Sequence, residues 1–579
     1  METRKGIGVS PGIAISTAIV LDAEDLVVPR RVVPADQVEA EIARFDEAVR
    51  RSLDELAALR ATLTEKYSRD VGAILGFHIS ILKDTSVSDS VRAVIRSEMV
   101  TAEYAVSVVL RKYASEFQSV TDRYLAERVK DIYDVERRLL HNLIGQRQQA
   151  LSHLTSDAVV VARDMLPSQT VALDRAHVRG FATDVGGRTS HTAIVARALG
   201  IPAVVGLGDI TAVASTGDTL ILDGNRGVVI VSPTPEQLAE YREMERRQRE
   251  LERELKDLVA LPAETLDGHQ VSIQANIEFP DEIDAAIARG ASGIGLYRTE
   301  FLYLASEREP TEEEHYQAYS ESLRRLGGRP LVIRTFDLGA DKVTQSKLAV
   351  PERNPFLGDR SIRMCLRNIP MFKRQLRAIL RASVLGDVRI MFPMISTIME
   401  LRQAKLVLRD VEEELEEEKI PFRRDIPVGM MVEVPSAALM ASQFAREVSF
   451  FSIGTNDLVQ YTLAVDRTNE RVAGLFCPAH PAVLMLIRDV IRVGHRNNIP
   501  VSMCGEMAGE PLYTLLLLGL GLRIFSMNST DIGEVKKIIR STTLSHARQV
   551  ARKVMSFDSE RQVLHYLREE TRKIAPEVV

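Results

Sequence analysis

The sequence predicts a multidomain α/β protein that ends in a (β/α)8 barrel. In the second half of the chain, eight short β-like runs alternate with helical patterns, which is typical of such a barrel. In the first half, a long stretch has apolar residues at helical spacing and is followed by β-rich runs. At 579 residues the chain is also too long for one hydrophobic core, so we expect several domains.

The first half of the chain is predicted to hold two domains. The runs EIARFDEAVRRSLDELAALRATL and ERVKDIYDVERRLLHNLIG predict an all-helical domain at residues 24–144. The β-like runs at 159–162, 178–183, 202–206 and 219–224 predict a compact α/β domain at residues 145–230. The opening segment GIGVSPGIAIS is also typical of strand and turn, so residues 1–23 are assigned to the same α/β domain. The helical domain is then either inserted in the α/β domain or adjoins it.

A charged segment separates these domains from the barrel. The sequence PEQLAEYREMERRQRELERELKDL predicts a linker helix within residues 231–262, although a solvated helix with no role beyond spacing is the simpler interpretation. The barrel itself is assigned to residues 263–579. Its strands are expected at 271–276, 292–297, 331–336, 388–393, 428–433, 449–455, 500–505 and 523–527.

The composition excludes several classes of protein. The net charge of −6, from 74 basic and 80 acidic residues, gives no case for nucleic acid as the main ligand. No apolar run approaches the roughly 20 residues that cross a bilayer, and the first residues lack the pattern of a signal peptide. We therefore expect a cytoplasmic protein without membrane insertion. The three cysteines form no CxxC pair, which argues against a disulfide framework or a structural zinc site.

Polar residues follow the predicted barrel strands. Because the catalytic groups of such barrels project from the C-terminal ends of the strands, we expect these side chains to converge on one face. They are Arg298, Glu300, Arg334, Asp337, Glu433, Asn456, Asp457, Cys504 and Glu506. Arginines at this face can bind a phosphate or a carboxylate, and Lys342 and Arg467 in the following loops add positive charge.

Two of the strand-end carboxylates, Glu433 and Asp457, suit Mg²⁺, which keeps several water or substrate oxygens as ligands. The ligand implied by arginines and a divalent cation together is a small phosphorylated carboxylic acid. Taken alone, any one of these arginines or glutamates is more often part of a surface ion pair. The combination is what favours a binding site.

Cys504 lies in MCGEMAG at the end of a predicted strand. A thiol, with a reference pKa of about 8.5, is mostly protonated at neutral pH and can give its proton to a carbanion or enolate. A free cysteine is also commonly a small buried hydrophobic residue, and this is the default interpretation for Cys365 and Cys477. For Cys504 the residues alone leave both interpretations open.

One histidine follows a glycine turn and precedes a predicted helix, in GGRTSHTAIVARALGIPAVVG. Thr189 and Ser190 are suitable N-cap residues for a helix that begins near His191 or Thr192. A phosphoryl group on His191 would lie near the helix N-terminus, where free backbone N–H groups stabilise its charge. The neutral imidazole that nucleophilic attack requires is common at physiological pH. Standing alone, a histidine at a helix start is more often a cap or a surface group.

Several long motifs occur in one order along the chain: GVSPGIAIS, GGRTSHTAIVARALGIPAVVG, GIGLYRTEFLY, IRTFDLGADK, NPFLGDRSIR, MVEVPSA, FSIGTNDLVQYTLAVDR and MCGEMAG. With these motifs the chain resembles Enzyme I of the bacterial phosphotransferase system, the phosphoenolpyruvate-protein phosphotransferases, along essentially its whole length. The resemblance implies that His191 takes a phosphoryl group from phosphoenolpyruvate on its Nε2 atom. That group would pass to the phosphocarrier protein HPr and start a sugar-uptake phosphorelay.

The resemblance also assigns the other site residues and the domains. Cys504 would protonate the enolate to give pyruvate, and Glu433 and Asp457 would hold Mg²⁺. The phosphoenolpyruvate-binding residues would be Arg298, Arg334, Asn456, Asp457 and Arg467. The helical domain would dock HPr, the barrel would form a homodimer, and the α/β phosphohistidine domain would swivel between them. The segment TSVSDSVRAV departs from the acidic run expected in the helical domain, so the docking residues are not assigned.

Two other functions fit parts of the sequence. A pyruvate phosphate dikinase or phosphoenolpyruvate synthase has a similar histidine motif and barrel but needs a large ATP-binding domain as well. The residues that precede His191 are mostly helical in pattern and contain no G-x-x-x-x-G-K-[ST] loop. A non-catalytic phosphoenolpyruvate sensor would bind the donor and a partner without transferring phosphate. The full set of acid, metal and arginine residues argues against the sensor.

Overall fold

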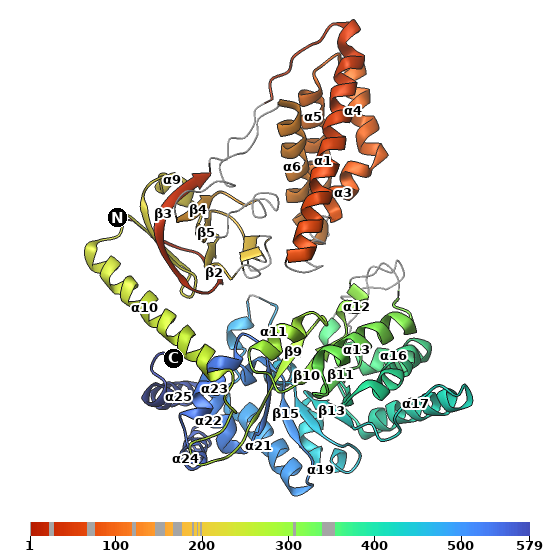
Figure 1. The fold of residues 1–579 in the computed structure, drawn as a ribbon, viewed down its shortest axis with the longest axis vertical. Helices are drawn as coiled ribbons and strands as arrows, with labels where there is room; N and C mark the ends of the chain where they lie inside the picture. The colour runs from red at the N-terminus through yellow and green to blue at the C-terminus, as the bar shows by residue number, and fades with distance from the viewer. Residues whose placement is uncertain are drawn as a thin grey trace. The chain divides into compact units, whose positions relative to one another are not determined.

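The computed structural model describes residues 2–21, 28–66, 76–118, 123–144, 157–165, 177–187, 190, 192–193, 195–196, 200–304, 309–337, 354–469 and 471–578. The chain forms two compact units, Met1–Gln248 and Arg249–Val579 (Figure 1). The first unit contains a helical bundle and a β-sheet with its own core, and the second contains a barrel. None of the helices in the described part of the chain is both long enough and apolar enough to cross a membrane.

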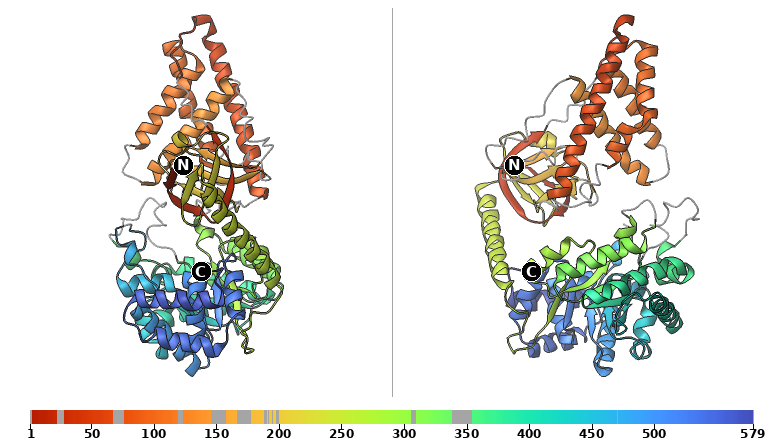
Figure 2. Two further views of the ribbon diagram at one scale, coloured as in Figure 1. Left: turned by 90° about the vertical axis from the view of Figure 1, so that its left-hand side faces the viewer. Right: turned by 45° about the vertical axis from the view of Figure 1, so that its right-hand side comes forward.

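The helical bundle consists of α1 (Val38–Lys66), α3 (Gly76–Lys83), α4 (Thr85–Glu98), α5 (Ala102–Gln118) and α6 (Arg123–Ile144), with a short 3-10 helix η1 (Ala35–Gln37) before α1. Its helices lie alongside one another and bury a shared apolar core that includes Phe45, Leu56 and Val106 (Figure 2). Helix α4 begins where the Asp84 side chain accepts a hydrogen bond from the Ser86 backbone N–H at 2.8 Å. The apolar spacing in the sequence therefore becomes the buried face of a bundle.

An eight-stranded sheet forms the rest of the first unit, in the order β1-β8-β7-β3-β4-β5-β6-β2. The strands are β1 (Glu2–Lys5), β2 (Ile7–Ser10), β3 (Ile13–Leu21), β4 (Ala158–Ala162), β5 (Val178–Thr183), β6 (Ala203–Val205), β7 (Thr219–Asp223) and β8 (Val228–Val231), with α9 (Ile210–Val213) before β7. Strands β3 and β4 are parallel neighbours, paired from Thr17 with Ala158 to Leu21 with Ala162. The helical bundle is therefore inserted into the sheet between β3 and β4.

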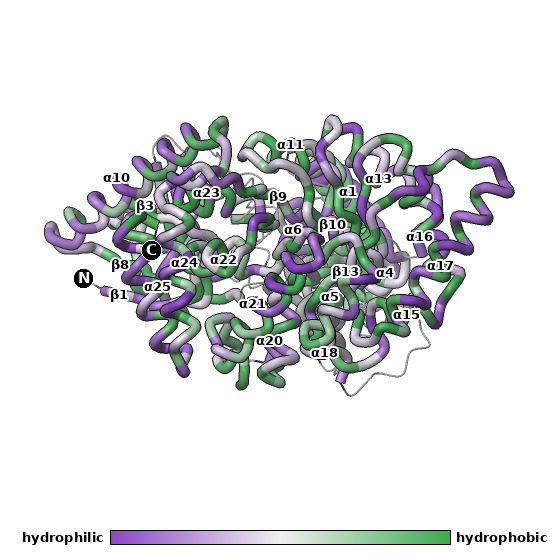
Figure 3. Tube along the Cα trace, turned by 90° about the horizontal axis from the view of Figure 1, so that it is seen from below, coloured by the Kyte–Doolittle hydropathy of each residue, from purple (hydrophilic) through white to green (hydrophobic). Residues whose placement is uncertain are grey.

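The charged segment forms one helix, α10 (Pro235–Leu258), as predicted. Its first turn is capped by Thr234, whose hydroxyl accepts from the Gln237 N–H at 3.3 Å while the Gln237 side chain accepts from the Thr234 N–H at 3.0 Å. Near this end, Tyr241 is buried against Ile221 and Ile230 of the sheet. The tube drawing shows α10 as largely hydrophilic (Figure 3). The helix is thus a solvated element with one apolar contact face.

The second unit is a closed barrel of eight parallel strands in the order β10-β11-β12-β13-β14-β15-β16-β9. The strands are β9 (Ser272–Ile277), β10 (Ile294–Arg298), β11 (Leu331–Arg334), β12 (Val388–Phe392), β13 (Val428–Val432), β14 (Phe451–Ile453), β15 (Val501–Met503) and β16 (Ile524–Met527). All eight strands lie within or overlap the runs predicted from the sequence. The predicted fold class is confirmed: an α/β multidomain chain with a helical domain, an α/β domain and a (β/α)8 barrel.

Helices surround the barrel strands: α11 (Glu282–Ala288), α12 (Phe301–Leu304), α13 (Glu312–Leu326), α15 (Ile362–Arg367), α16 (Ile369–Ala382), α17 (Ile398–Glu417), α18 (Pro435–Leu439), α19 (Ala441–Phe444), α20 (Thr455–Leu463), α21 (Pro481–Arg496), α22 (Pro511–Leu520), α23 (Ile532–Arg540), α24 (Leu544–Val554) and α25 (Glu560–Ile574). Short 3-10 helices are η2 (Pro355–Leu357), η3 (Ser383–Leu385), η4 (Ala473–Leu475) and η5 (Glu506–Ala508). Apolar residues of the strands and of these helices form one continuous buried core. That core fixes the positions of the strand ends.

Candidate active site

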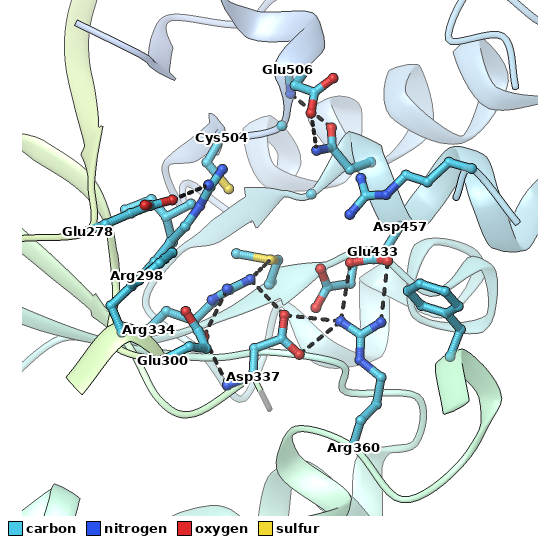
Figure 4. A pocket seen from close by; sticks show the side chains of 18 of the residues that line it. Glu278, Arg298, Glu300, Arg334, Asp337, Arg360, Glu433, Asp457, Cys504 and Glu506 are labelled. Carbon is cyan, nitrogen blue, oxygen red and sulfur yellow. Dashed lines mark hydrogen bonds and ion pairs between the residues drawn. The ribbon is translucent and has the colours of Figure 1, made fainter. Parts of the chain in front are cut away.

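A cavity of about 280 Å³ lies at the C-terminal ends of the barrel strands (Figure 4). The following residues that the sequence assigned to the barrel site line it: Arg298, Arg334, Glu433, Asn456, Asp457, Arg467 and Cys504. Lys342, which was expected to add positive charge there, lies outside the described residues. The lining also contains Glu278, Glu300, Phe301, Asp337, Phe356, Arg360, Met431 and Glu506. Because parallel strands of a closed barrel end on one rim, side chains from distant parts of the chain meet there.

Two glycines leave room for neighbouring side chains at this rim. Gly454 follows β14, and a Cβ atom on it would lie 2.8 Å from Oε2 of Glu433. Gly505 lies two residues after the end of β15, and a Cβ atom on it would lie 1.9 Å from Oγ1 of Thr455. Both distances are far below a normal van der Waals contact, so a larger residue at either position would displace the neighbouring group. Close packing at the rim of the cavity therefore explains why the GTN and CGE segments of the motifs contain glycine.

Arg334 ends β11 and is held by two carboxylates. Its Nη2 donates to Oε1 of Glu300 at 2.9 Å, and its Nη1 lies 2.9 Å from Oδ2 of Asp337. Burial alone would lower the pKa of Arg334, but attraction to these two carboxylates raises it, so the guanidinium stays charged. Its Nε is buried and has no hydrogen-bond partner in the described part of the structure. The side chain thus combines a fixed orientation with an unused donor.

Two further arginines of this rim form ion pairs, and of the two only Arg298 was assigned a role from the sequence. Arg298 donates from Nη1 to Oε1 of Glu278 at 2.9 Å. Arg360 donates from Nη2 to both oxygens of Asp337, at 2.9 and 3.1 Å, and lies 3.5 Å from Asp457. Arg360 belongs to the NPFLGDRSIR motif, which is the only signal in the sequence that points to it.

The backbone next to Arg360 is strained. Ser361 has a φ of 61°, in the left-handed region that residues other than glycine rarely adopt. Its side chain is fully buried. This unusual conformation directly follows Arg360 in the chain.

Glu433 and Asp457 are both buried at the rim. Glu433 Oε1 accepts a hydrogen bond from the Met394 backbone N–H at 2.6 Å. Burial, followed by repulsion from Asp457 and Asp337, raises the pKa of Glu433 to about 8. A divalent cation would remove this repulsion, and the two carboxylates match the few protein ligands that Mg²⁺ takes. Among the described residues, no group of three or more His, Cys, Asp or Glu side chains is arranged to hold a metal ion.

Cys504 follows β15 and is 3% exposed. Its Sγ accepts a hydrogen bond from Oγ of Ser452 at 3.2 Å, and its carbonyl oxygen accepts from Nδ2 of Asn276 at 3.0 Å. Burial raises the pKa of the thiol. A buried thiol that stays protonated and faces a cavity can serve as a proton donor. By contrast, Cys365 is fully buried in the apolar core, in keeping with a structural residue.

Asn456 and Arg467 complete the polar lining. Asn456 and Glu506 exchange two hydrogen bonds of 3.0 Å each, from the amide to the carboxylate and from the Glu506 N–H to the amide oxygen. The Arg467 backbone N–H donates to Gln460 at 3.3 Å. Within the residues described here, the Arg467 guanidinium has no ion pair, so its donors can meet an incoming anion.

His191 lies outside the described residues, as does Thr189. The positions around His191 agree with the predicted turn and helix start. Gly186 has a φ of 128°, which favours glycine, and Ser190 donates from its N–H to the Gly187 carbonyl at 3.0 Å. The Ser190 hydroxyl accepts from the Ala193 N–H at 3.3 Å, which is the geometry of an N-cap.

Comparison with known proteins defines the class of the chain. Three family models match it: the N-terminal region of phosphoenolpyruvate-utilising enzymes at residues 5–128, their mobile domain at 154–227, and their phosphoenolpyruvate-binding domain at 252–544. The last of these ranges contains the barrel and the cavity at its rim. Fold and site therefore define a phosphoenolpyruvate-utilising enzyme.

Relatives that match the chain along nearly its whole length identify the family within this class. A phosphoenolpyruvate-protein phosphotransferase from Bacillus sp. (strain S) is 45% identical over 98% of both chains. One from Bacillus subtilis is 42% identical over 98% of this chain and 100% of its own length, and one from Haemophilus influenzae is 44% identical over 94% and 95%. The chain belongs to the phosphoenolpyruvate-protein phosphotransferase family.

Proposed function

We propose that the protein takes the phosphoryl group of phosphoenolpyruvate onto Nε2 of His191 and passes it to the phosphocarrier protein HPr, as the first step of a sugar-uptake phosphorelay. The observation that carries the proposal is the rim cavity, where arginines, a pair of buried carboxylates and a buried thiol line one space. These groups are the ones that an anionic enol phosphate requires: donors for its oxygens, a place for a cation, and an acid for its carbon.

The donor is bound by the arginines of the rim. Its phosphate lies between Arg298 and Arg334, both of which are already oriented by carboxylate partners. Arg467 and Asn456 bind the remaining oxygens of the donor. Asp457 belongs to the same binding site. Guanidinium groups with fixed directions stabilise charge that develops on the phosphoryl oxygens in the transition state without reorganising during the reaction.

We assign Mg²⁺ to Glu433 and Asp457. When bound there, the cation neutralises charge on the phosphoryl oxygens. The two carboxylates are buried and repel each other, which is the property expected of residues that share a cation.

The transfer has two steps. The neutral imidazole of His191 attacks phosphorus with the lone pair of Nε2, the bond between phosphorus and the enol oxygen breaks, and enolpyruvate leaves as its enolate. The enolate carbon then takes the proton of the Cys504 thiol and becomes the methyl group of pyruvate. The thiolate regains a proton from solvent. Because burial raises the pKa of Cys504, the acid form is the one present at neutral pH.

The domain roles follow from the same proposal. The α/β domain at residues 1–23 and 145–230 carries His191, the helical domain at 24–144 docks HPr, and the barrel at 263–579 binds the donor and forms the homodimer. The linker at 231–262 allows the α/β domain to swivel between donor and acceptor. The insertion of the bundle between β3 and β4 supports a division of labour between carrying the phosphoryl group and docking the acceptor.

The direct test mixes the full chain with phosphoenolpyruvate labelled at phosphorus, Mg²⁺ and purified HPr. We expect label on the protein first and on HPr afterwards. His191→Ala abolishes both signals, whereas the matched variant His269→Ala, at an exposed position far along the chain, keeps them. Full labelling of His191→Ala would overturn the assignment. A sensor would bind the donor and leave both proteins unlabelled, and a dikinase would also consume ATP.

A further inference from the structure

A second cationic cavity, of about 600 Å³, lies in the barrel unit away from the rim. Its lining comes from α21, the end of α22, and α24: Arg488, Arg492, Gly519, Leu520, Ser545, Arg548, Ala551, Arg552 and Met555. Helix α22 begins shortly after η5, which borders the rim cavity, and ends at this second cavity. Its ten residues span about 15 Å, so the two cavities lie at opposite ends of α22.

Four arginines surround this cavity as two matched pairs. Arg488 and Arg492 are four residues apart on α21, and Arg548 and Arg552 are four residues apart on α24. Residues at this spacing lie on the same face of a helix, so each pair projects together. Like charges at this spacing destabilise a helix, and two such pairs around one space repel each other further. An arrangement of this kind is favourable when an anion lies between the pairs.

The floor of the cavity is backbone at Gly519. A Cβ atom there would lie 2.0 Å from the Ala547 carbonyl oxygen, so α22 and α24 approach each other more closely than a side chain would allow. Glycine at this position therefore allows α22 and α24 to pack closely beside the arginine pairs.

The positive charge of the cavity is only partly balanced by its surroundings. None of the described residues that line it is acidic. On α21, Asp489 lies 2.8 Å from Arg488 and 3.9 Å from Arg492 and is shared by both. On α24, neither Arg548 nor Arg552 has an ion pair or side-chain hydrogen bond within the described part of the chain.

A fifth arginine adds to this charge. Arg523 donates from Nη1 to the carbonyls of Leu518 and Leu522, at 3.0 and 2.7 Å, and so lies beside the end of α22. Burial and the positive charge of Arg548 lower the pKa of Arg523. The guanidinium of Arg548 is therefore close enough to Arg523 for the two charges to repel each other.

We propose that this cavity binds a small molecule with two or more phosphoryl groups. Each arginine presents a planar fork of N–H donors that matches two phosphate oxygens, and two pairs on separate helices suit two separate phosphoryl groups. The Ser545 hydroxyl supplies a further donor. The lining residues that the structure describes include no aromatic side chain on which a base could stack, so a bisphosphate or a pyrophosphate fits better than a nucleotide recognised through its base. This site is independent of the proposed phosphoryl transfer.

The test is calorimetric titration of the full chain with inorganic pyrophosphate, with orthophosphate and a hexose bisphosphate as further arms. Because the rim cavity is also cationic, each titration is repeated in Arg334→Met. We expect pyrophosphate binding to persist in Arg334→Met and to weaken at least about tenfold in the double variant Arg548→Met with Arg552→Met. Orthophosphate should bind more weakly than pyrophosphate, and the hexose bisphosphate arm distinguishes an organic ligand from an inorganic one.

A matched control separates site binding from net charge. Arg446 is exposed and lies outside both cavities, so Arg446→Met removes a positive charge elsewhere and should leave the affinity within about twofold. Equal losses in Arg446→Met and in an Arg548→Met single variant would show non-specific attraction and overturn the proposal. So would unchanged binding in the double variant, or binding lost in Arg334→Met alone. Since Arg548 and Arg552 are exposed, the double variant should keep the melting temperature of the parent.

Discussion

The two cavities of the barrel unit both use arginine but balance its charge differently. At the rim, Arg298, Arg334 and Arg360 each pair with at least one carboxylate at 2.9 Å. In the second cavity, Arg488 pairs with Asp489, but Arg548 and Arg552 have no such partner among the described residues. Carboxylates that hold a guanidinium also fix its direction, which suits the stabilisation of a transition state. Arginines without partners stay free to move and their charge is not neutralised by a neighbouring carboxylate, which suits capture of a strongly anionic ligand. This difference in pairing therefore suits the rim to catalysis and the second cavity to ligand binding.

Among the substitutions that test this comparison, replacement of Arg334 is expected to have the largest effect on activity. Arg334→Met should lower kcat for pyruvate formation by about 10²–10³-fold, because a donor oriented toward developing phosphoryl charge is lost. Arg548→Met, which removes the same group from the second cavity, should leave kcat unchanged. The measurement is steady-state pyruvate production by both variants in the presence of HPr.

Stability must be followed in the same variant. Loss of Arg334 leaves Glu300 and Asp337 without this partner in a buried site, which costs about 3–5 kcal/mol. Arg334→Lys keeps the positive charge and should recover most of the stability but little of the activity, because lysine lacks the fork of donors. A fully active Arg334→Lys would contradict the claim that catalysis depends on the fixed direction of the guanidinium donors.

A smaller effect is expected at the proton donor. Cys504→Ala should keep donor affinity and phosphohistidine formation but slow pyruvate release by about 10²-fold, since general acid catalysis contributes on that scale. Rapid quench of the phosphoenzyme, compared with pyruvate release, separates the two steps. Equal rates in Cys504→Ala and the parent would return this thiol to the class of structural cysteines, alongside Cys365.

The carboxylate pair should give the rim cavity a pH dependence that the second cavity lacks. The pKa of Glu433 is raised from 4.5 to about 8, so the stability that this group contributes is complete below 4.5 and is lost as pH rises through about 8. Mg²⁺ needs the carboxylate form. Its affinity should therefore rise about tenfold per pH unit up to about pH 8 and then level off.

Thermal melting with and without Mg²⁺ across this pH range measures the effect. Glu433→Gln should weaken Mg²⁺ binding and make the remaining affinity independent of pH over the same interval, because the titrating group is gone. An unchanged pH slope in Glu433→Gln would assign the titration to another group.

The sequence predicted the strands of the barrel because each is a short apolar run between turn residues, and a closed parallel barrel then brings their ends together. Strand β8 (Val228–Val231) was not predicted. It is a four-residue strand that follows β7 closely, and only its antiparallel pairing with β1 and β7 identifies it. Whether the helical bundle was inserted or adjoining was also open, because the pairing of Thr17 with Ala158 is a contact between distant parts of the chain.

Some residues at the rim could be predicted from the sequence and others could not. Residues at strand ends, such as Arg298 and Glu433, follow from the rule that catalytic groups project from those ends. Arg360 comes from a loop after β11 and reaches the cavity through its contacts with Asp337, so the rule does not include it. Glu278 directly follows β9, but its pairing with Arg298 on the neighbouring strand is a property of the fold. No sequence motif marks the second cavity, because its arginine pairs lie on separate helices.

The most direct measurement of the central claim is the position of the phosphoryl group on the protein. The full chain is treated with phosphoenolpyruvate and Mg²⁺, digested at alkaline pH, and mapped by mass spectrometry. We predict one phosphorylated residue, His191, and loss of that phosphate on brief acid treatment. An acid-stable phosphate on the neighbouring Ser190 or Thr192, or phosphate on a histidine other than His191, would contradict the account.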